Sequence, residues 1–340
     1  MTRALVIQTA FLGDVILTLP LVQVLKSSIA DLQLDFLAIP ETTEILKSHP
    51  DISQVIVYDK HGRHSSVSAF LDLRAGLKKR IYDYVFCPHR SMRSALLASG
   101  TGARLRVGFD RSAWKRGFTH LVPWKFGVHE VERNLSLLEP VNIEPRREAP
   151  KLFPGDENRD EATRFLSEKG VERPYAVVAP GTVWNTKQYP IEMMLQVVRG
   201  LLERFSRVIL IGGKKDAGLA ESFGSLGDKV VSAIGEFSFM SSAEIIRRAS
   251  LLVANDSAPI HVASAFNVPT VAIFGPTVKD FGFFPYHRSS KVVETETLGC
   301  RPCSIHGGNR CPIGTFECMR NISPERIVSE SLKLLERGDG

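Results

Sequence analysis

Several features are missing from this 340-residue sequence, and each absence excludes a class of protein. It contains no run of 18 or more apolar residues, so it predicts no membrane-spanning helix. Only one cysteine, Cys87, precedes residue 300, which argues against a disulfide-stapled secreted domain. We find no short-period repeat and no low-complexity tract. RNP-like, helix-turn-helix and zinc-finger signatures are also absent, which disfavours nucleic acid as a partner.

The N-terminal stretch, MTRALVIQTAFLGDVILTLPLVQVL, is apolar enough to be mistaken for a signal peptide. Gly13 and Asp14 interrupt it, however, and no small-residue cleavage site follows. We therefore expect a cytosolic protein. Its length predicts two domains, and its 44% hydrophobic and 24% charged residues are typical of a globular protein. The net charge of +6 indicates an anionic partner without identifying it.

The chain alternates between short apolar runs and amphipathic stretches, a pattern that indicates β-α-β units with a mostly parallel sheet. A helix is predicted from Gly13 to about Lys26, with further helices near 189–205, 242–249, 259–266 and 324–337. The predicted strands are Ala4–Ile7, Leu34–Ala38, Val55–Tyr58, Tyr84–Cys87, Arg106–Gly108, Tyr175–Ala179, Val208–Ile211, Leu251–Ala254 and Thr270–Phe274.

A proline- and charge-rich segment at 142–174 interrupts this alternation and predicts a domain boundary. We expect two Rossmann-like domains, at 1–160 and 171–322, with a C-terminal helix in 323–340 packing back on the body. In open α/β sheets, ligands bind beyond the carboxyl ends of the strands. Three polar loops lie there, at 8–15, at 180–190 and after Ala254.

The last of these loops, Asn255-Asp256-Ser257, allows two interpretations. Asp256 and Ser257 stand where a helix N-cap would lie, ahead of Pro259, so capping alone explains them. Alternatively, the amide N–H groups of this helix N-terminus form an anion site, with Asp256 facing sugar hydroxyls and His261 reaching a phosphate.

Asp14 and Lys187 are similarly ambiguous. Asp14 complements the dipole of a first helical turn, yet it interrupts an apolar segment, which is unfavourable unless the carboxylate is paired or used. Lys187 is either a surface lysine or, in a loop with Thr182, Trp184 and Thr186, a group that neutralises a diphosphate.

Four cysteines near the C-terminus form the pattern C-x2-C-x7-C-x6-C, from Cys300 through Cys303 and Cys311 to Cys318. A C-x2-C step suits a structural zinc site, but the second pair lacks it. A packed loop with free thiols and a pair of disulfides are the alternatives, the last disfavoured in the cytosol.

Four segments in order resemble the ADP-heptose:lipopolysaccharide heptosyltransferases. They are QTAFLGDVILTLPL, PGTVWNTKQYP, NDSAPIHVASAFNVPTVAIFGPT and the tail CRPC…RCPIGTFECMRNISPERI, whose cysteines look most like heptosyltransferase II. The resemblance covers nearly the whole chain. It implies a GT-B glycosyltransferase, with two Rossmann-like domains facing each other across a cleft.

The resemblance also implies an inverting transfer of heptose from ADP-heptose to the inner core of lipopolysaccharide (Kdo/heptose-lipid A), with no obligatory cofactor or metal. Asp14 matches the family's general base, and Lys187 matches the lysine that steadies the leaving diphosphate. The remaining matches are donor contacts, namely Gly13, Gly181, Thr182, Phe237, Asp256, Ser257 and His261. Two residues depart from the family pattern: Ala258 replaces a glycine, and Phe11 replaces a small hydroxyl residue.

The segment from Arg74 to Lys125 holds twelve Lys or Arg against two acidic residues. Arg90 and Arg93 follow a predicted strand and suit acceptor phosphates or Kdo carboxylates. The rest of this basic stretch, with Trp114 and Trp124, is either a solvated face or a surface for peripheral contact with an anionic membrane at the cytoplasmic face of the inner membrane.

A related glycosyltransferase with a different nucleotide-sugar or acceptor is one alternative, and two other classes of function also compete with the heptosyltransferase. A nucleotide-binding oxidoreductase requires a G-x-G-x-x-G turn, which neither 8-QTAFLGD-14 nor 211-IGGKKD-216 provides. A non-catalytic nucleic-acid or membrane-binding protein would use the basic stretch and not Asp14.

Overall fold

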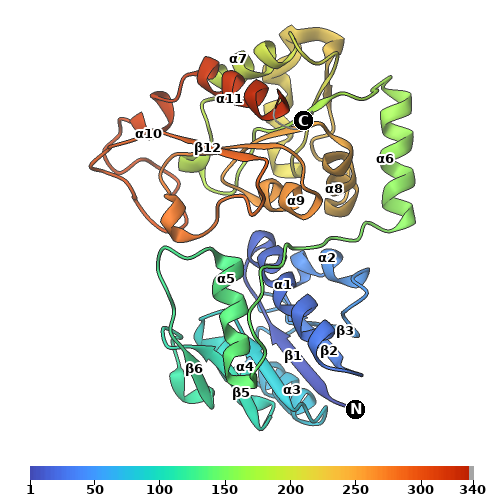
Figure 1. Ribbon diagram of the computed structural model, residues 1–340, viewed down its shortest axis with the longest axis vertical. Helices are drawn as coiled ribbons and strands as arrows, with labels where there is room; N and C mark the ends of the chain where they lie inside the picture. Colours follow the sequence, from blue (N-terminus) through green and yellow to red (C-terminus); the bar gives the residue numbers. More distant parts are fainter. Residues whose placement is uncertain (337–340) are drawn as a thin grey trace. The chain divides into compact units, whose positions relative to one another are not determined.

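The computed structural model describes residues 1–336 of the chain. It divides into two compact units, Met1–Phe153 and Pro154–Gly340. Each is an α/β unit around one six-stranded sheet, and every strand pair recorded in the two sheets is parallel (Figure 1). No helix within residues 1–336 is long and apolar enough to cross a membrane.

The first unit has the strand order β3-β2-β1-β4-β5-β6. Its strands are β1 (Arg3–Ile7), β2 (Gln33–Ala38), β3 (Gln54–Val57), β4 (Tyr84–Cys87), β5 (Leu105–Phe109) and β6 (His120–Val122). Its helices are α1 (Leu12–Ser28), α2 (Glu44–Lys47), α3 (Val67–Lys78), α4 (Met92–Gly100) and α5 (Glu130–Leu135). The order reverses between β1 and β4, so the loops after these two strands lie at the usual ligand position of such folds.

Helix α1 is the central helix of this unit. Every residue from Val15 to Leu25 is buried, which explains why its sequence has no polar face. Helix α5 packs on it, and Asn134 Nδ2 donates to the carbonyl of Leu17 over 3.2 Å. Helices α3 and α4 pack against a cluster that includes Leu5 and Ile7 of β1.

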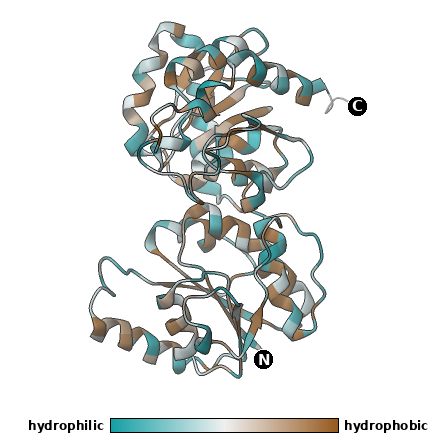
Figure 2. Cartoon of the chain, turned by 90° about the vertical axis from the view of Figure 1, so that its left-hand side faces the viewer, coloured by the Kyte–Doolittle hydropathy of each residue, from teal (hydrophilic) through white to brown (hydrophobic). Residues whose placement is uncertain are grey.

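The second unit has the strand order β12-β11-β10-β7-β8-β9. Its strands are β7 (Ala176–Ala179), β8 (Val208–Leu210), β9 (Val230–Ser232), β10 (Leu251–Asn255), β11 (Thr270–Phe274) and β12 (Ser290–Glu294). Its α-helices are α6 (Asp156–Glu168), α7 (Ile191–Leu201), α8 (Phe239–Arg248), α9 (Ala258–Phe266), α10 (Glu317–Arg320) and α11 (Pro324–Glu336). Helices α7 and α11 share one apolar core with the strands, and Figure 2 shows apolar residues gathered in the strands of each unit.

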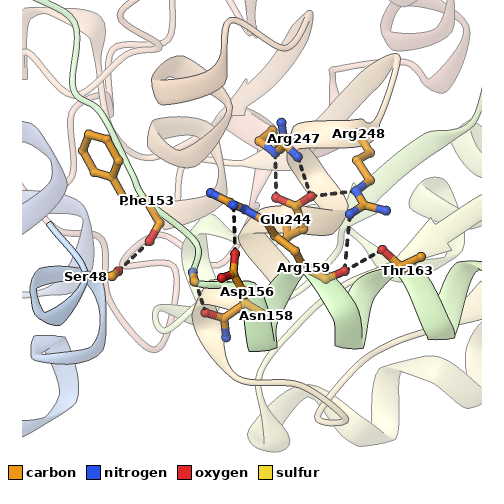
Figure 3. Close-up of polar contacts among 10 residues, drawn as sticks. Ser48, Phe153, Asp156, Asn158, Arg159, Thr163, Glu244, Arg247 and Arg248 are labelled. Atoms are coloured by element: carbon orange, nitrogen blue, oxygen red, sulfur yellow. Dashed lines mark hydrogen bonds and ion pairs between the residues drawn. The ribbon is translucent and has the colours of Figure 1, made fainter. Parts of the chain in front are cut away.

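Glu244 anchors α6 to α8 (Figure 3). Its buried carboxylate accepts from Arg247 Nε over 2.6 Å and from Arg248 Nε over 2.6 Å. Arg248 in turn donates to the carbonyl of Arg159 in α6 over 3.3 Å. The same figure shows Ser48 donating to the carbonyl of Phe153, the last residue of the first unit, over 2.5 Å.

The predicted alternation of strands and helices is confirmed, and the nine predicted strands are present with ends shifted by one residue at most. Three strands that pattern reasoning missed, β6, β9 and β12, lie at the sheet edges. The boundary between the units lies within 142–174, but α6 belongs wholly to the second unit, whereas the predicted first domain ran to residue 160. Of the predicted helix 324–337, residue 337 lies outside the described residues.

Candidate active site

In the first unit, polar residues gather at the carboxyl ends of the strands. Asp14 is half-buried in the first turn of α1, where Thr18 Oγ1 donates to its carbonyl over 2.8 Å. Gln8, directly after β1, donates from its side chain to Thr18 Oγ1 over 3.2 Å. The N-cap residue of α1 is Phe11, whose side chain is 54% exposed and cannot cap. Gly13 and Asp14 therefore lie in the first turn of a helix whose N-cap residue makes no side-chain capping bond.

A second group connects the end of β1 to the end of β4. His89 Nδ1 lies 2.8 Å from Thr9 Oγ1 and 2.9 Å from Ser94 Oγ. Burial lowers the pKa of His89 to about 4, with the charges of Lys60 and Arg90 acting in the same direction. At neutral pH this imidazole is therefore an uncharged hydrogen-bonding group that fixes the two loops. Sequence reasoning overlooked it.

Three guanidinium groups surround the ring of Trp124. The Cζ atoms of Arg133, Arg90 and Arg111 lie 4.2, 4.7 and 5.1 Å from its centroid. Such geometry allows cation–π attraction and concentrates positive charge. Arg93, predicted to act with Arg90, donates to the hydroxyl of Tyr58 over 3.4 Å.

In the second unit, Lys187 and Asp256 form an ion pair. Lys187 Nζ lies 2.7 Å from Asp256 Oδ2, and Thr277 Oγ1 donates to the same oxygen over 2.7 Å. The three residues follow β7, β10 and β11, three neighbouring strands. The structure thus brings together two predicted residues from segments about 70 positions apart. Thr277 was not predicted, although it ends the conspicuous run Gly275-Pro276-Thr277.

Asn255 holds these loops in register. It is fully buried at the end of β10, and its side chain donates to the carbonyl of Pro180 over 2.8 Å. Its Oδ1 accepts from the backbone N–H of Tyr189 over 3.0 Å. The side-chain amide of Asn255 therefore bonds both ends of the loop that carries Lys187. The sequence motif alone did not indicate this role.

The prediction that the side chain of Asp256 or Ser257 caps α9 is wrong. Ser257 is the N-cap residue of α9, but its hydroxyl donates to the carbonyl of Asn255 over 3.2 Å and makes no capping bond. Pro259 lies in the first turn as predicted, and His261 is buried on the next. The N-terminus of α9 therefore presents amides without a side-chain cap, as an anion site requires.

Gly181 and Thr182 follow β7 in the same loop as Lys187, and Phe237 precedes α8. A Cβ on Gly181 would meet the carboxylate of Asp216 at 2.4 Å, so any larger residue there requires the Asp216 side chain to shift. The hydroxyl of Thr182 is engaged locally, accepting from the N–H of Trp184 over 3.0 Å. Phe237 is half-buried and packs edge-on against Phe165 of α6, with ring centroids 4.9 Å apart.

The cysteine-bearing tail braces the Lys187 loop. Thr186 N donates to the carbonyl of Gly308 over 2.9 Å, and Gly308 N donates back to Thr186 Oγ1 over 2.8 Å. Gly307 has φ +82° and lies against the side chain of Lys187, where a Cβ would meet Lys187 Cγ at 3.1 Å. The tail thus positions the lysine.

The five cysteines are free thiols in this structure, and none of them forms a disulfide. Cys318 is buried, while Cys303 is exposed and its Sγ lies 3.3 Å from the carbonyl of Cys300. Within residues 1–336, no three His, Cys, Asp or Glu side chains are arranged to hold a metal ion.

The fold matches solved glycosyltransferases over its whole length. A glycosyl transferase of family 9 from Veillonella parvula superimposes with a TM-score of 0.87 at 23% identity, covering 99% of this chain and 98% of that one. The E. coli ADP-heptose LPS heptosyltransferase II gives a TM-score of 0.79 at 21% identity, covering 100% of both chains. The fold class is therefore GT-B.

The sequence defines the family. Residues 70–309 match the model of glycosyltransferase family 9 (heptosyltransferase), and the chain belongs to this family of enzymes. Among curated relatives, lipopolysaccharide heptosyltransferase 3 of E. coli K12 is 29% identical over 78% of this chain and 80% of its own length. Heptosyltransferase 1 of Pseudomonas aeruginosa is also 29% identical, over 88% of this chain and 86% of its own. The E. coli K12 heptosyltransferase 2 is 23% identical over 98% of both.

Family membership makes the protein a glycosyltransferase and decides against the oxidoreductase and the non-catalytic binder. It does not select a type, because the more identical relatives are types 3 and 1 while type 2 is matched over more of the chain.

Proposed function

We propose that this protein transfers heptose from ADP-heptose to the lipopolysaccharide inner core, with inversion and without an obligatory metal. The observation that carries the proposal is the cluster of Lys187, Asp256 and Thr277 beside the uncapped N-terminus of α9. An ammonium and helix amides together suit a diphosphate, and a carboxylate suits sugar hydroxyls.

The second unit supplies the donor chemistry in this proposal. The ion pair and the side-chain hydrogen bond of the Asp256 carboxylate both use Oδ2, so in this proposal Oδ1 contacts heptose hydroxyls. An ammonium has three donors, so Lys187 can keep Asp256 and still bind a phosphate oxygen. It stabilises the charge that develops on ADP as the bond to the anomeric carbon breaks. His261, Ser257, Thr182 and the backbone at Gly181 complete the phosphate contacts, and Phe237 lies near adenine.

The first unit supplies the acceptor chemistry. Asp14 takes the proton from the acceptor hydroxyl as its oxygen attacks the anomeric carbon. The guanidinium groups around Trp124 bind acceptor phosphate or Kdo carboxylate, with Arg90 as the principal contact and Arg93 beside Tyr58 as a second. The cysteine-bearing tail, which looks most like heptosyltransferase II, supports an enzyme of type 2.

The same unit is our candidate for contact with an anionic membrane surface. Lys78, Lys79, Lys115 and Lys125 of the basic stretch are exposed, as is Phe126 beside the last of these. Trp124, by contrast, packs among arginines, so we do not include it in this surface.

The test is ADP release by wild type, Asp14→Asn and Asp31→Asn on heptose-deficient lipopolysaccharide cores, in EDTA, with ADP-heptose binding measured in parallel. Asp31 is an exposed aspartate beyond the other end of α1 and serves as the matched control. We expect Asp14→Asn to lose at least about a hundredfold in turnover with donor binding retained, and Asp31→Asn to behave like wild type. A wild type that neither binds ADP-heptose nor releases ADP overturns the donor assignment.

A further inference from the structure

His89 is a half-buried imidazole two residues after β4, and the proposed chemistry does not use it. Strand β4 pairs with β1, and the strand order of the first unit reverses between these two strands. In open α/β sheets, ligands bind outside the carboxyl ends of the strands at such a reversal. The backbone of His89 is held there, because its carbonyl accepts from Cys87 Sγ over 3.2 Å. The imidazole is therefore attached to a fixed loop at the place where a ligand is expected.

Three hydroxyl groups surround Nδ1 of this imidazole. Thr9 Oγ1, Ser94 Oγ and Ser91 Oγ lie 2.8, 2.9 and 3.3 Å from it. Thr9 and Ser94 are buried, and their hydroxyl oxygens lie 3.0 Å apart. Ser91 caps α4, accepting from the N–H of Ser94 over 3.2 Å and donating to Ser94 Oγ over 3.1 Å. Nδ1 is thus held from the loop after β1 and from the first turn of α4.

This network places the ring proton of His89 on Nε2. The hydroxyl protons can run in one direction, from Ser91 to Ser94, from Ser94 to Thr9 and from Thr9 to Nδ1, so that each proton has an acceptor. A proton on Nδ1 would leave the buried hydroxyl proton of Thr9 without an acceptor in this cluster, which is unfavourable. Burial lowers the pKa of His89 to about 4, so the ring carries a single proton at neutral pH.

The opposite nitrogen of the ring, Nε2, is open to solvent. Within residues 1–336, no protein group accepts from Nε2, and Nε2 is not one of the buried polar atoms. With its proton in place, this nitrogen has no lone pair and serves as a hydrogen-bond donor, not as a base. The next residue is Arg90, whose Cζ lies 4.7 Å from the centroid of Trp124. An uncharged donor therefore stands beside a guanidinium, which suits a sugar that carries a hydroxyl next to an acidic group.

We propose that His89 is an acceptor-binding residue, whose Nε2–H donates to a hydroxyl oxygen of the acceptor sugar while Arg90 pairs with the acidic group of that sugar. Thr9, Ser91 and Ser94 are positioning residues, because they hold Nδ1 and so turn Nε2 outward. This inference rests on the proposed function in taking the first unit to bind the acceptor. It adds an uncharged donor to a surface whose other proposed ligands are cations.

The first experiment separates the two ring nitrogens with two amide variants. The amide nitrogen of glutamine reaches about as far as Nε2, whereas the amide of asparagine reaches only Nδ1. His89→Asn should raise the KM for a heptose-deficient core about tenfold and leave the KM for ADP-heptose unchanged, while His89→Gln stays within about threefold of wild type for both substrates. If His89 only ties the two loops together, asparagine is the better substitute. That reversed order, or a rise in the KM for ADP-heptose, overturns the inference.

His120→Asn is the matched control for these variants. His120 is exposed on β6, and its Nδ1 also lies near a hydroxyl, 3.0 Å from Thr119 Oγ1. We expect both KM values of His120→Asn to equal those of wild type. A rise in its KM for the core equal to that of His89→Asn would mean that any imidazole of this unit has the same effect, which overturns the inference.

A second measurement needs no turnover. The side-chain 15N resonances of His89 in wild type should show the proton on Nε2 at neutral pH. A heptose-deficient core freed of its acyl chains should shift the Nε2 resonance, and ADP-heptose alone should not. A proton on Nδ1 overturns the inference even if the variants fail to fold. If wild type transfers no heptose but the core shifts Nε2, the proposed function fails and the binding site stands. If wild type transfers heptose and the core leaves Nε2 unmoved, the inference fails and the function stands.

Discussion

Lys187 Nζ and Thr277 Oγ1 converge on a single oxygen of Asp256, each at 2.7 Å. The side chains of Lys187 and Asp256 are 13% and 5% exposed, so this is a nearly dry ion pair and not a surface contact. Breaking a buried pair by removing one partner leaves an uncompensated charge, which is far more costly than losing an exposed pair.

Lys187→Met should therefore destabilise the protein as well as inactivate it. We expect a loss of about 3 kcal/mol in the free energy of unfolding, measured by chemical denaturation. Lys333→Met is the matched control, because Lys333 pairs with Glu330 at 2.8 Å but is 54% exposed. That variant should lose less than about 1 kcal/mol. Equal losses in the two variants would contradict the buried pair.

The brace between the tail and the lysine loop predicts that Gly307→Ala weakens donor binding. The new Cβ crowds Lys187 Cγ, Thr186 Oγ1 and Trp184 Cβ, and it also strains a left-handed backbone. Gly314→Ala carries the same kind of backbone strain, at φ +77°, but its Cβ would meet no atom within 4 Å. The difference between the two variants therefore measures the effect of crowding alone. Isothermal titration should show weaker ADP-heptose binding for Gly307→Ala only. If both variants bind alike, the brace does not position Lys187.

Asn255→Ala should remove the link between the two ends of the Lys187 loop. It leaves the carbonyl of Pro180 and the N–H of Tyr189 without their partner, which we expect to destabilise the protein by about 2–4 kcal/mol. Asn185→Ala, an exposed substitution inside the same loop, should change stability by less than about 0.5 kcal/mol. Thermal unfolding of the two variants checks this, and a neutral Asn255→Ala contradicts it.

The hydrogen-bonded carboxylate of Glu244 predicts that the stability of the fold decreases at acidic pH. Burial disfavours its charge, but hydrogen bonds from Arg247 and Arg248 outweigh burial and hold its pKa below the usual range. A depressed carboxyl pKa stabilises the fold above the unfolded-state value and loses that contribution as pH falls through the folded-state value. The difference in melting temperature between wild type and Glu244→Gln should be full above about pH 5 and shrink toward pH 3. Glu221→Gln, at an exposed position, should show no such trend.

Much of the fold could be predicted because the central strands are buried on both faces and read as continuous apolar runs. Val253 and Ile273, in β10 and β11, are examples. The missed strands β6, β9 and β12 are edge strands. In β6 and β12, exposed residues such as His120 and Lys291 interrupt the apolar run.

The site was only partly predictable for a different reason. Lys187 and Asp256 belong to local motifs, and each motif could be interpreted on its own. Thr277 and Gly308 matter through partners distant in sequence, and only packing shows which partner each one meets. Ser257 shows the opposite error, since a local capping rule assigned a hydrogen bond that its hydroxyl makes elsewhere.

The arginines around Trp124 also equip the protein with its own optical reporter. The chain has three tryptophans, of which Trp124 lies among the guanidinium groups of the first unit and Trp184 in the lysine loop of the second. An anion that withdraws a guanidinium from the Trp124 ring changes the surroundings of that indole, while a donor changes those of Trp184. If Trp114 and one of the other two tryptophans are replaced by phenylalanine, each variant keeps a single tryptophan. The fluorescence of Trp124 and of Trp184 can then be followed separately, without an attached dye.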